Sequence, residues 1–313
     1  METEGIFKQE IMKIGITGVT GFVGQNLASY LADFDILGVS RGAEGNNISY
    51  QELSVDIYSN LKVFIHLAGK AHDLKNTSDD KEYFQINTEL TKRLFDQFLE
   101  SECETFIYMS SVKAAADSFE GVITESVTPN PITVYGKSKL AAEEYILSSK
   151  YLKDKRVYVL RPCMIHGPNN KGNLNLLYSF ILKGIPYPFG KYLNRRSFVS
   201  VENLCFIIKE LIDNDKIESG IYNIADDTSL STIDLVKVIS EVLCKPTRIL
   251  KFPKLFVRFI AKVGDLVPIP INSERLLKLT ENYEVSNLKI KNAIQKKLPL
   301  SSKEGIKKTI ASF

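Results

Sequence analysis

Tyr135 and Lys139, four residues apart, carry the chemistry that this sequence specifies most clearly. On a helix the two side chains would lie on the same face, one turn from each other. A free tyrosine titrates near about pH 10, and a cation one turn away stabilises the phenolate and lowers that pKa. The pair could therefore move a proton on or off a hydroxyl group near physiological pH. Ser111 ends an apolar run upstream and adds a hydroxyl to this set.

Three glycines near the start of the chain, Gly18, Gly21 and Gly24, lie between an apolar, β-rich run at 11–17 and a predicted helix. The first permits a tight turn, the second a close approach of the backbone to a pyrophosphate, and the third close packing of the helix on the strand. The N–H groups and positive dipole at the start of the helix can then hold phosphates. This context predicts a dinucleotide-binding site.

Short apolar strands alternate with amphipathic helices through the first half of the chain. Strands are predicted at 11–17, 36–39, 54–57, 62–67, 105–109 and 156–160, and helices at 25–32, 83–99 and 135–150. The alternation predicts an α/β fold with a doubly wound, parallel, Rossmann-type sheet. Ligands on such sheets bind beyond the carboxyl ends of the strands. The glycine loop and residues 66–69, 110–111 and 161–162 fall at predicted strand ends, so we expect them to meet in one crevice.

After about residue 166 the alternation ends, and prolines and glycines separate short helices and isolated strands. Strands are predicted at 197–201 and 220–224, and a helix at 232–243 with Ser231 or Thr232 as its cap. We predict an NAD(P)-binding domain over 1–165 and a smaller, mostly helical substrate lobe over 166–313. Segments near 198–212 and 220–226 are expected to pack back on the first domain.

The composition is ordinary for a soluble globular protein, with 313 residues and a formal net charge of +3. That charge is too small to indicate nucleic acid, and we interpret the lysine-rich segment after Lys237 as a solvated basic surface. Four widely spaced cysteines and three histidines lack metal-site spacing, so no metal is expected, and reduced thiols favour the cytoplasm. No apolar run reaches the roughly 20 residues that would cross a bilayer, and the N-terminus lacks a signal-peptide core.

Residues 254–262 mix basic and bulky apolar side chains, as helices at a membrane interface do. Two interpretations are open for this segment. We favour a helix that faces the core of the substrate lobe, and association with a membrane surface is the alternative.

The residue after the second strand bears on the choice of cofactor. Many NAD sites place an acidic residue there, which holds the ribose 2′-hydroxyl. Here the strand leads into Arg41, which could instead meet the 2′-phosphate of NADP. We favour NADP over NAD, and a surface arginine that leaves the choice open is the alternative. Asp56 is a candidate for hydrogen-bonding the adenine, or else a helix-capping or loop aspartate.

Together these motifs resemble the extended short-chain dehydrogenase/reductase family, in particular its branch of nucleotide-sugar epimerases, dehydratases and reductases. The resemblance covers nearly the whole chain and rests on motifs at 18–24, 66–69, 111, 135–139, 160–162, 166–168 and 195–203, and on Asn87. It implies that Tyr135 is the acid and base on a sugar hydroxyl or ketone. Lys139 would bind the nicotinamide ribose and lower the tyrosine pKa, and Ser111 would hydrogen-bond the reacting oxygen.

The resemblance implies two larger sets of site residues. Those expected to hold the cofactor lie in the glycine loop, at strand ends or on the two helices: Gly18, Gly21, Phe22, Val23, Gly24, Arg41, Asp56, Leu67, Ala68, Gly69, Asn87, Ser110, Tyr135, Lys139 and Pro162. Those expected to bind the substrate are Lys113, Asn173, Arg196 and Arg275. Arg196 matches an arginine that binds the substrate diphosphate, with a salt bridge inside the lobe as the alternative.

The residues after Ser111 narrow the choice among the reactions that this family catalyses. Relatives that dehydrate a sugar carry an Asp-Glu pair there, whereas this chain has Val112 and Lys113, so we disfavour a 4,6-dehydratase. The chain resembles most a UDP-glucose 4-epimerase-like subgroup that includes reductases forming UDP-N-acetylquinovosamine. We favour a 4-ketoreductase that acts on a UDP-4-keto-6-deoxy-hexosamine with NADP or NAD. The alternative is a UDP-hexose or UDP-N-acetylhexosamine 4-epimerase with tightly bound NAD.

A non-catalytic NADP-binding protein is a further alternative, against which the intact Ser111, Tyr135 and Lys139 argue. Proteins of this family often form homodimers through two helices of each subunit. Here those helices would be 83–99 and 135–149, so we expect a homodimer. The expected small-molecule partner is a UDP-sugar substrate.

Overall fold

The structure is a computed structural model that describes residues 12–42, 45, 47–70, 79–149, 155–168, 170, 173–267 and 271–313, apart from the side chains of Asn173 and Lys278. The chain forms two compact units. The first unit comprises 1–110, 138–159 and 218–220, and the second comprises 111–137, 160–217 and 221–313. The boundary expected after residue 165 stays a prediction.

The main sheet has seven strands in the order β10-β7-β5-β4-β1-β2-β3. The strands are Lys13–Thr17 (β1), Asp35–Ser40 (β2), Ile48–Ser49 (β3), Val63–His66 (β4), Thr105–Met109 (β5), Arg156–Pro162 (β7) and Gly220–Ile224 (β10). β1 pairs in parallel with β2 on one side and with β4 on the other. The strand order therefore reverses between β1 and β4, which confirms the predicted doubly wound sheet. Ligand sites in such sheets lie beyond the ends of these two strands.

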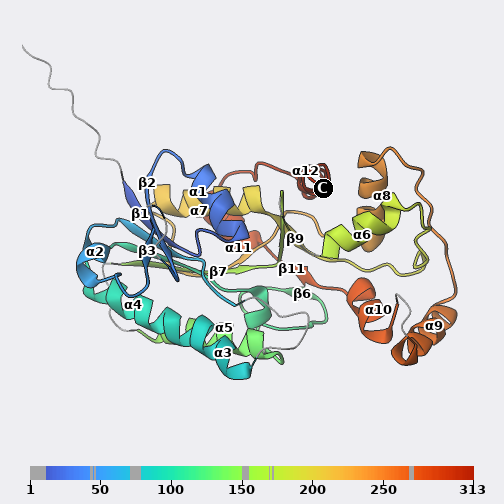
Figure 1. Ribbon diagram of the computed structural model, residues 1–313, viewed down its shortest axis with the longest axis horizontal. Helices are drawn as coiled ribbons and strands as arrows, with labels where there is room; N and C mark the ends of the chain where they lie inside the picture. Colours follow the sequence, from blue (N-terminus) through green and yellow to red (C-terminus); the bar gives the residue numbers. More distant parts are fainter. Residues whose placement is uncertain are drawn as a thin grey trace, which may run out of the picture. The chain divides into compact units, whose positions relative to one another are not determined.

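Helices cover both faces of the sheet in the first unit, as Figure 1 shows. α1 (Phe22–Tyr30) lies on one face, and α4 (Leu90–Glu100) and α5 (Val134–Ser148) lie side by side on the other. The core beneath α4 is aromatic. Phe95 and Phe98 are fully buried, and each has its ring centroid 5.2 Å from that of Phe106 on β5. Burial of such rings stabilises the packing of α4 on the sheet.

The helix predicted at 83–99 changes its winding along its length. It begins as α3 (Asp80–Phe84), widens into a π-helical turn at Gln85–Glu89 and continues as α4. A π turn holds one more residue than an α turn and is frequent at functional sites. Here it buries Asn87 and Thr88, and the Thr88 hydroxyl donates to the carbonyl of Ser138 at 2.8 Å. Apolar spacing alone does not distinguish the two windings.

The prediction of a strand at 54–57 was wrong. Residues Val55–Ser59 form a short helix, α2, whose cap Ser54 accepts a hydrogen bond from the N–H of Ile57. The alternation of Val55 and Ile57 is typical of a strand, but the local cap satisfied the backbone instead. The third strand of the sheet is the two-residue β3 nearby, which is too short to leave a periodic pattern.

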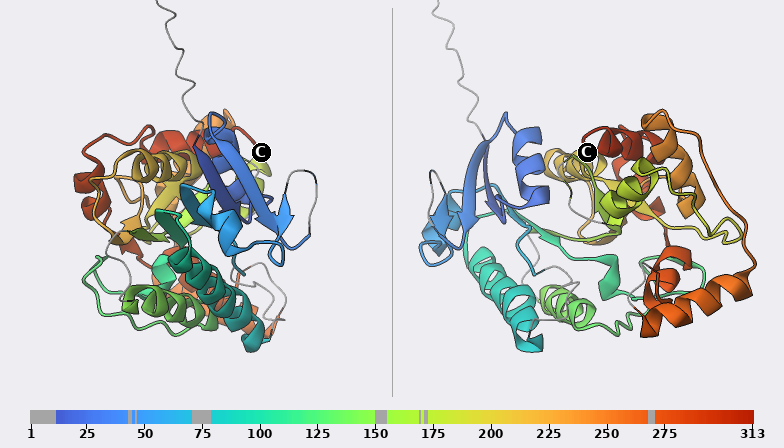
Figure 2. Two further views of the ribbon diagram at one scale, coloured as in Figure 1. Left: turned by 90° about the vertical axis from the view of Figure 1, so that its left-hand side faces the viewer. Right: turned by 45° about the vertical axis from the view of Figure 1, so that its right-hand side comes forward.

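The second unit is mostly helical, as predicted. Its helices are η2 (Val112–Ala114, 3₁₀), α6 (Asn173–Leu182), α7 (Val201–Asp213), α8 (Thr232–Val242), α9 (Lys254–Leu266), α10 (Ser273–Thr280), α11 (Leu288–Ile294) and α12 (Ser302–Ile310). Two small parallel sheets join β6 (Val122–Ile123) to β11 (Glu284–Val285), and β8 (Met164–His166) to β9 (Phe198–Ser200). Ser231 caps α8 as expected. Figure 2 shows α9 and α10 side by side.

The core of this unit lies around α8. Val236 and Ile239 are buried there in one cluster with Val257 and Ala261 of α9 and Ile306 of α12. Across the described ranges, no helix is long and apolar enough to cross a membrane. The same ranges hold no cluster of three metal-ligating side chains.

Candidate active site

The glycine loop follows β1 and has the geometry that its spacing predicts. Gly18 adopts φ +68°, a left-handed conformation that side chains disfavour, and a Cβ there would stand 3.0 Å from the backbone nitrogen of Ala68. A Cβ on Gly24 would stand only 2.2 Å from the carbonyl oxygen of Gly18. Each position therefore excludes a side chain, and the helix packs directly on the loop.

Helix α1 begins at the loop with an uncapped N-terminus, because its N-cap residue is Gly21. The N–H groups of Phe22 and Val23, which open the helix, lack intrahelical partners by the geometry of any helix start. With the positive end of the helix dipole, they form a ready site for a phosphate or diphosphate. The residues present thus fit a dinucleotide.

A directed chain of hydrogen bonds runs through the buried His66 at the end of β4. The N–H of Ala68 donates to the Thr17 hydroxyl (3.1 Å), which lies 2.7 Å from His66 Nδ1. On the other side, His66 Nε2 lies 2.9 Å from the Thr91 hydroxyl, which itself donates to the carbonyl of Asn87 (2.8 Å). Because Thr91 donates onward, Nε2 must carry the proton and Nδ1 must accept. His66 is therefore a neutral linker between β1, β4 and the π turn.

We expect this histidine to make stability sensitive to acid. Burial, followed by the charge of Lys139, lowers the pKa of His66 to about 3. The unfolded chain binds a proton at this residue below about pH 6.5, so stability falls with pH from there towards 3, by about 1.4 kcal/mol per pH unit. Urea unfolding should therefore show a His66→Asn variant losing about 2 kcal/mol less than the wild type between about pH 6.5 and 5. Equal losses would contradict the buried neutral imidazole.

Asn87 fastens the loop after β4. Its side-chain oxygen accepts from the N–H of Lys70 (2.8 Å), and its amide group donates to the Lys70 carbonyl (3.1 Å) and to the Ser138 hydroxyl (3.0 Å). A Cβ on Gly69 would stand 3.0 Å from both Asn87 Oδ1 and Lys139 Nζ. Asn87 thus positions the backbone of the loop beside the lysine, which is a supporting role.

Lys139 lies on α5 and is buried against the end of β5. Its Nζ donates to the carbonyl of Met109 (2.8 Å) and lies 4.8 Å from the ring centroid of Tyr108. Burial lowers its pKa to about 8, and the nearby Glu143 carboxylate opposes that shift. Ser110, expected to contact the cofactor, donates its hydroxyl to Glu143. Glu143 therefore links the end of β5 to α5, a function that the sequence analysis missed.

Ser111 and Lys113 lie in the second unit, at the short helix η2. Ser111 is buried and caps this helix, its hydroxyl oxygen accepting from the N–H of Lys113 (3.2 Å). A hydroxyl oxygen that accepts at a cap still has its own proton to donate. The Lys113 ammonium donates to the carbonyl of Asp117 (3.2 Å) and lies 5.4 Å from the ring centroid of Tyr283.

Tyr135 lies in the first turn of α5, half-buried, with Lys139 one turn further on the same helix. Asp117 fixes the segment that leads into this turn: its carboxylate accepts from the N–H groups of Ile132 (2.7 Å) and Thr133 (2.8 Å) and from the Thr133 hydroxyl (2.8 Å). Burial acts to raise the pKa of Asp117, but these bonds hold it below its usual range. Asp117 is therefore an ionised anchor for the start of the helix.

A glycine lets the start of α5 approach η2. A Cβ on Gly136 would stand 2.5 Å from the carbonyl oxygen of Lys113. Gly136 also donates its N–H to the Thr133 hydroxyl (3.1 Å). The backbone next to Tyr135 therefore lies against the backbone that follows Ser111, within one unit.

The predicted substrate residues are spread over the second unit. Arg196 forms an ion pair with Glu281 at 3.5 Å, and both side chains are about a quarter exposed. Arg275 lies in the first turn of α10, with its N–H bonded to Asn272. Asn173 starts α6, and its side chain lies outside the described residues.

The remaining predicted cofactor residues lie at ends of sheet strands or helices. Arg41 is exposed directly after β2, and the glycine loop meets that strand through the bond from Gly18 N–H to the Val39 carbonyl (3.2 Å). Asp56 lies in the first turn of α2. Pro162 ends β7, which the sequence predicted to stop two residues earlier.

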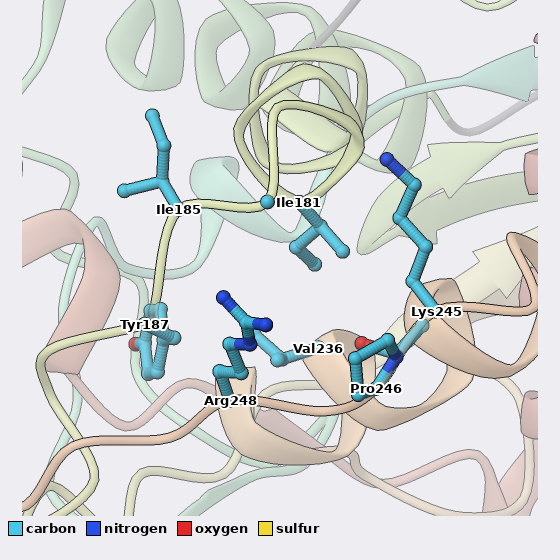
Figure 3. Close-up of a pocket in the computed structure, with 9 residues that line it drawn as sticks. Ile181, Ile185, Tyr187, Val236, Lys245, Pro246 and Arg248 are labelled. Carbon is cyan, nitrogen blue, oxygen red and sulfur yellow. The ribbon is translucent and has the colours of Figure 1, made fainter.

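A pocket of about 280 Å³ lies elsewhere in the second unit, between the end of α6 and the segment after α8. Figure 3 shows Ile181 and Ile185 opposite Lys245 and Arg248 around it. None of the predicted site residues lines this pocket, so it is distinct from the candidate active site.

Comparison with known proteins shows which family this chain belongs to. Residues 14–225 match the NAD dependent epimerase/dehydratase family. The chain is 31% identical to a UDP-glucose 4-epimerase of Vibrio cholerae over 95% of its own length and 94% of that protein. It is 29% identical to the UDP-2-acetamido-2,6-beta-L-arabino-hexul-4-ose reductase of Pseudomonas aeruginosa over 52% of its length and 38% of that protein.

Among solved structures, the UDP-glucuronic acid 4-epimerase of Bacillus cereus in complex with NAD has the same fold. The TM-score is 0.73 at 17% identity, covering 96% of this chain and 98% of that one. This likeness extends over nearly the whole chain.

Proposed function

Since this chain belongs to the NAD-dependent epimerase/dehydratase family, we propose that it transfers hydride at C4 of a UDP-sugar. The observation that supports the proposal is the set of Ser111, Tyr135 and Lys139, of which Ser111 caps η2 and Lys139 is buried one helical turn after Tyr135. Within that reaction we propose the direction of a 4-ketoreductase, which acts on a UDP-4-keto-6-deoxy-hexosamine.

The cofactor would rest on the first unit. The start of α1 and the close packing at Gly18 and Gly24 suit its pyrophosphate, and Lys139 beside Gly69 suits the nicotinamide ribose. When bound, the nicotinamide supplies or accepts the hydride. Arg41 at the end of β2, where an acidic residue would favour NAD, supports NADP and hence a cofactor that is consumed and released.

The protein's own part in the reaction is proton transfer to the C4 oxygen. Tyr135 would give its phenolic proton to that oxygen as the ketone becomes an alcohol, and the Lys139 ammonium would stabilise the phenolate that remains. Ser111, whose oxygen accepts at the η2 cap, would donate its hydroxyl proton in a hydrogen bond to the same oxygen. Arg196, whose ion pair with Glu281 is long and partly exposed, would exchange that partner for the substrate diphosphate.

A UDP-sugar 4-epimerase is the second candidate. The 31% identity with the Vibrio cholerae epimerase over nearly the whole chain favours it. An epimerase needs the same three side chains, but it must also release and recapture the keto sugar on its other face while keeping its NAD.

Incubation with three substrates separates these candidates. A UDP-4-keto-6-deoxy-N-acetylhexosamine with NADPH should give a fall in absorbance at about 340 nm and an NMR-defined alcohol, as expected for hydride transfer to a ketone. UDP-glucose and UDP-N-acetylglucosamine should then remain unchanged with added NAD. Epimer formation from either, without added cofactor, would replace the reductase by the epimerase.

A substitution at Arg41 tests whether the protein prefers NADP to NAD. Arg41→Gln should weaken NADPH binding by about 10- to 100-fold and leave NADH binding unchanged, because only NADPH carries the 2′-phosphate. Equal effects on both would remove the argument for NADP. Failure of all substrates to react, with cofactor binding verified by fluorescence, would overturn the proposed function itself.

A further inference from the structure

Helix α9 has two apolar faces, of which only one is used inside the protein. Val257 and Ala261 face the core of the second unit and are 3% and 1% exposed. On the same helix Leu255 is 79% exposed, Phe259 65% and Leu266 88%. The expected core-facing helix is therefore present, but it accounts for less than half of the apolar side chains.

The exposed apolar residues share one side of the helix. At about 100° per residue they fall within an arc of about 100°, well away from the buried side. They are Leu255, Phe256, Phe259, Val263 and Leu266. Contiguous exposed apolar surface of this kind marks a site of interaction with a partner or a membrane.

Positive charge borders this apolar arc. Arg258 and Lys262 are exposed along one flank, Lys254 is exposed at the start of the helix, and Lys251 is exposed three residues before it. The acidic residue of the helix, Asp265, has its carboxylate bound by the N–H (2.9 Å) and hydroxyl (2.6 Å) of Ser273. Long basic side chains beside bulky apolar ones can reach phosphate groups while the apolar residues enter an interface.

We propose that α9 docks the protein on an anionic phospholipid surface. The helix has 13 residues and is about 20 Å long, so it would lie along the surface with Phe259 and Leu266 among the acyl chains. Arg258 and Lys262 would then meet lipid phosphates, each contributing to an attraction that is absent for a neutral membrane.

A second copy of the chain fits this surface less well. In an antiparallel symmetric contact centred on α9, the basic flank of each copy would meet the other's, which places like charges together. The homodimer expected from the sequence uses 83–99 and 135–149 instead. Anionic lipid complements both the apolar arc and its charged border.

Vesicle flotation of the full-length protein tests the proposal. Vesicles of phosphatidylcholine with about 30% phosphatidylglycerol should carry the protein upward, and vesicles of phosphatidylcholine alone should leave it behind. Arg258→Gln with Lys262→Gln should weaken binding by about 30-fold, and Leu255→Ser with Phe259→Ser by at least about tenfold. Added salt should weaken wild-type binding.

Matched controls use residues of the same unit that lie off this helix. Leu288→Ser, at an exposed leucine of α11, and Lys216→Gln with Lys297→Gln, at exposed lysines, should bind vesicles like the wild type. Unchanged melting temperatures would show that every variant folds. Binding that ignores lipid charge, or controls that lose binding as the α9 variants do, would overturn the proposal. So would self-association that the α9 variants abolish in the absence of vesicles.

Discussion

A Tyr135→Phe variant should transfer hydride about 10²- to 10⁴-fold more slowly than the wild type, with cofactor affinity unchanged. The substitution removes the phenolic hydroxyl whose proton the C4 oxygen needs, and it keeps an aromatic ring of the same size in the first turn of α5. Single-turnover kinetics with the 4-keto substrate and NADPH measure the chemical step separately from binding.

The same helix offers a control for this loss. Tyr145 lies on α5, and its hydroxyl donates to Asp96 at 2.6 Å on the surface of the first unit. Tyr145→Phe should leave the rate within about twofold, because no reacting atom depends on that bond. A Tyr135→Phe enzyme that works at the wild-type rate would end the assignment of Tyr135 as the proton donor.

The second large effect is expected at Lys139. Lys139→Met should lower the rate of ketone reduction by at least about 10²-fold, because the phenolate left on Tyr135 loses its neighbouring cation. Lys137→Met, an exposed lysine two residues earlier, is the matched control and should have little effect. Loss of the cation next to the buried Glu143 will also destabilise the fold. A double variant with Glu143→Gln should recover stability and stay inactive.

Lys139 should also shape the pH profile. Its pKa is lowered to about 8 by burial, so the ammonium is lost as pH rises through that value, well before an ordinary lysine deprotonates. The rate of ketone reduction should therefore fall above about pH 8. The residual rate of Lys139→Met should lack that limb, and a limb that persists in the variant would assign the titration to another group.

The parts of the site that could be predicted depend on residues that lie close together in the sequence. The spacing of Gly18, Gly21 and Gly24 indicates a crowded backbone, and the structure leaves no room for a Cβ at Gly24 and little at Gly18. The pair of Tyr135 and Lys139 needs only one turn of helix, and α5 supplies it. Strand ends follow from short apolar runs, which is why residues 66–69 and Ser111 could be placed at the ends of strands.

The parts that could not be predicted join residues that are far apart in the chain. Glu143 holds Ser110, and Asp117 holds Thr133, through bonds that leave no periodic trace in the sequence. The partner of Arg196 is Glu281, 85 positions further along, and composition does not pair them. In each case the fold brings an acidic side chain next to a hydrogen-bond donor. The sequence alone does not show which acidic residue meets which donor.

The wide turn at Gln85–Glu89 is the place where this helix can change length. Removing one residue from it would leave an ordinary α turn, and α4 would keep its orientation relative to α3, because the wide turn holds that one extra residue. Phe95 and Phe98 would stay in the aromatic core, and only the side chains of the turn, Asn87 among them, would change position. A deletion within α4, by contrast, would rotate everything beyond it by about 100° and undo the packing.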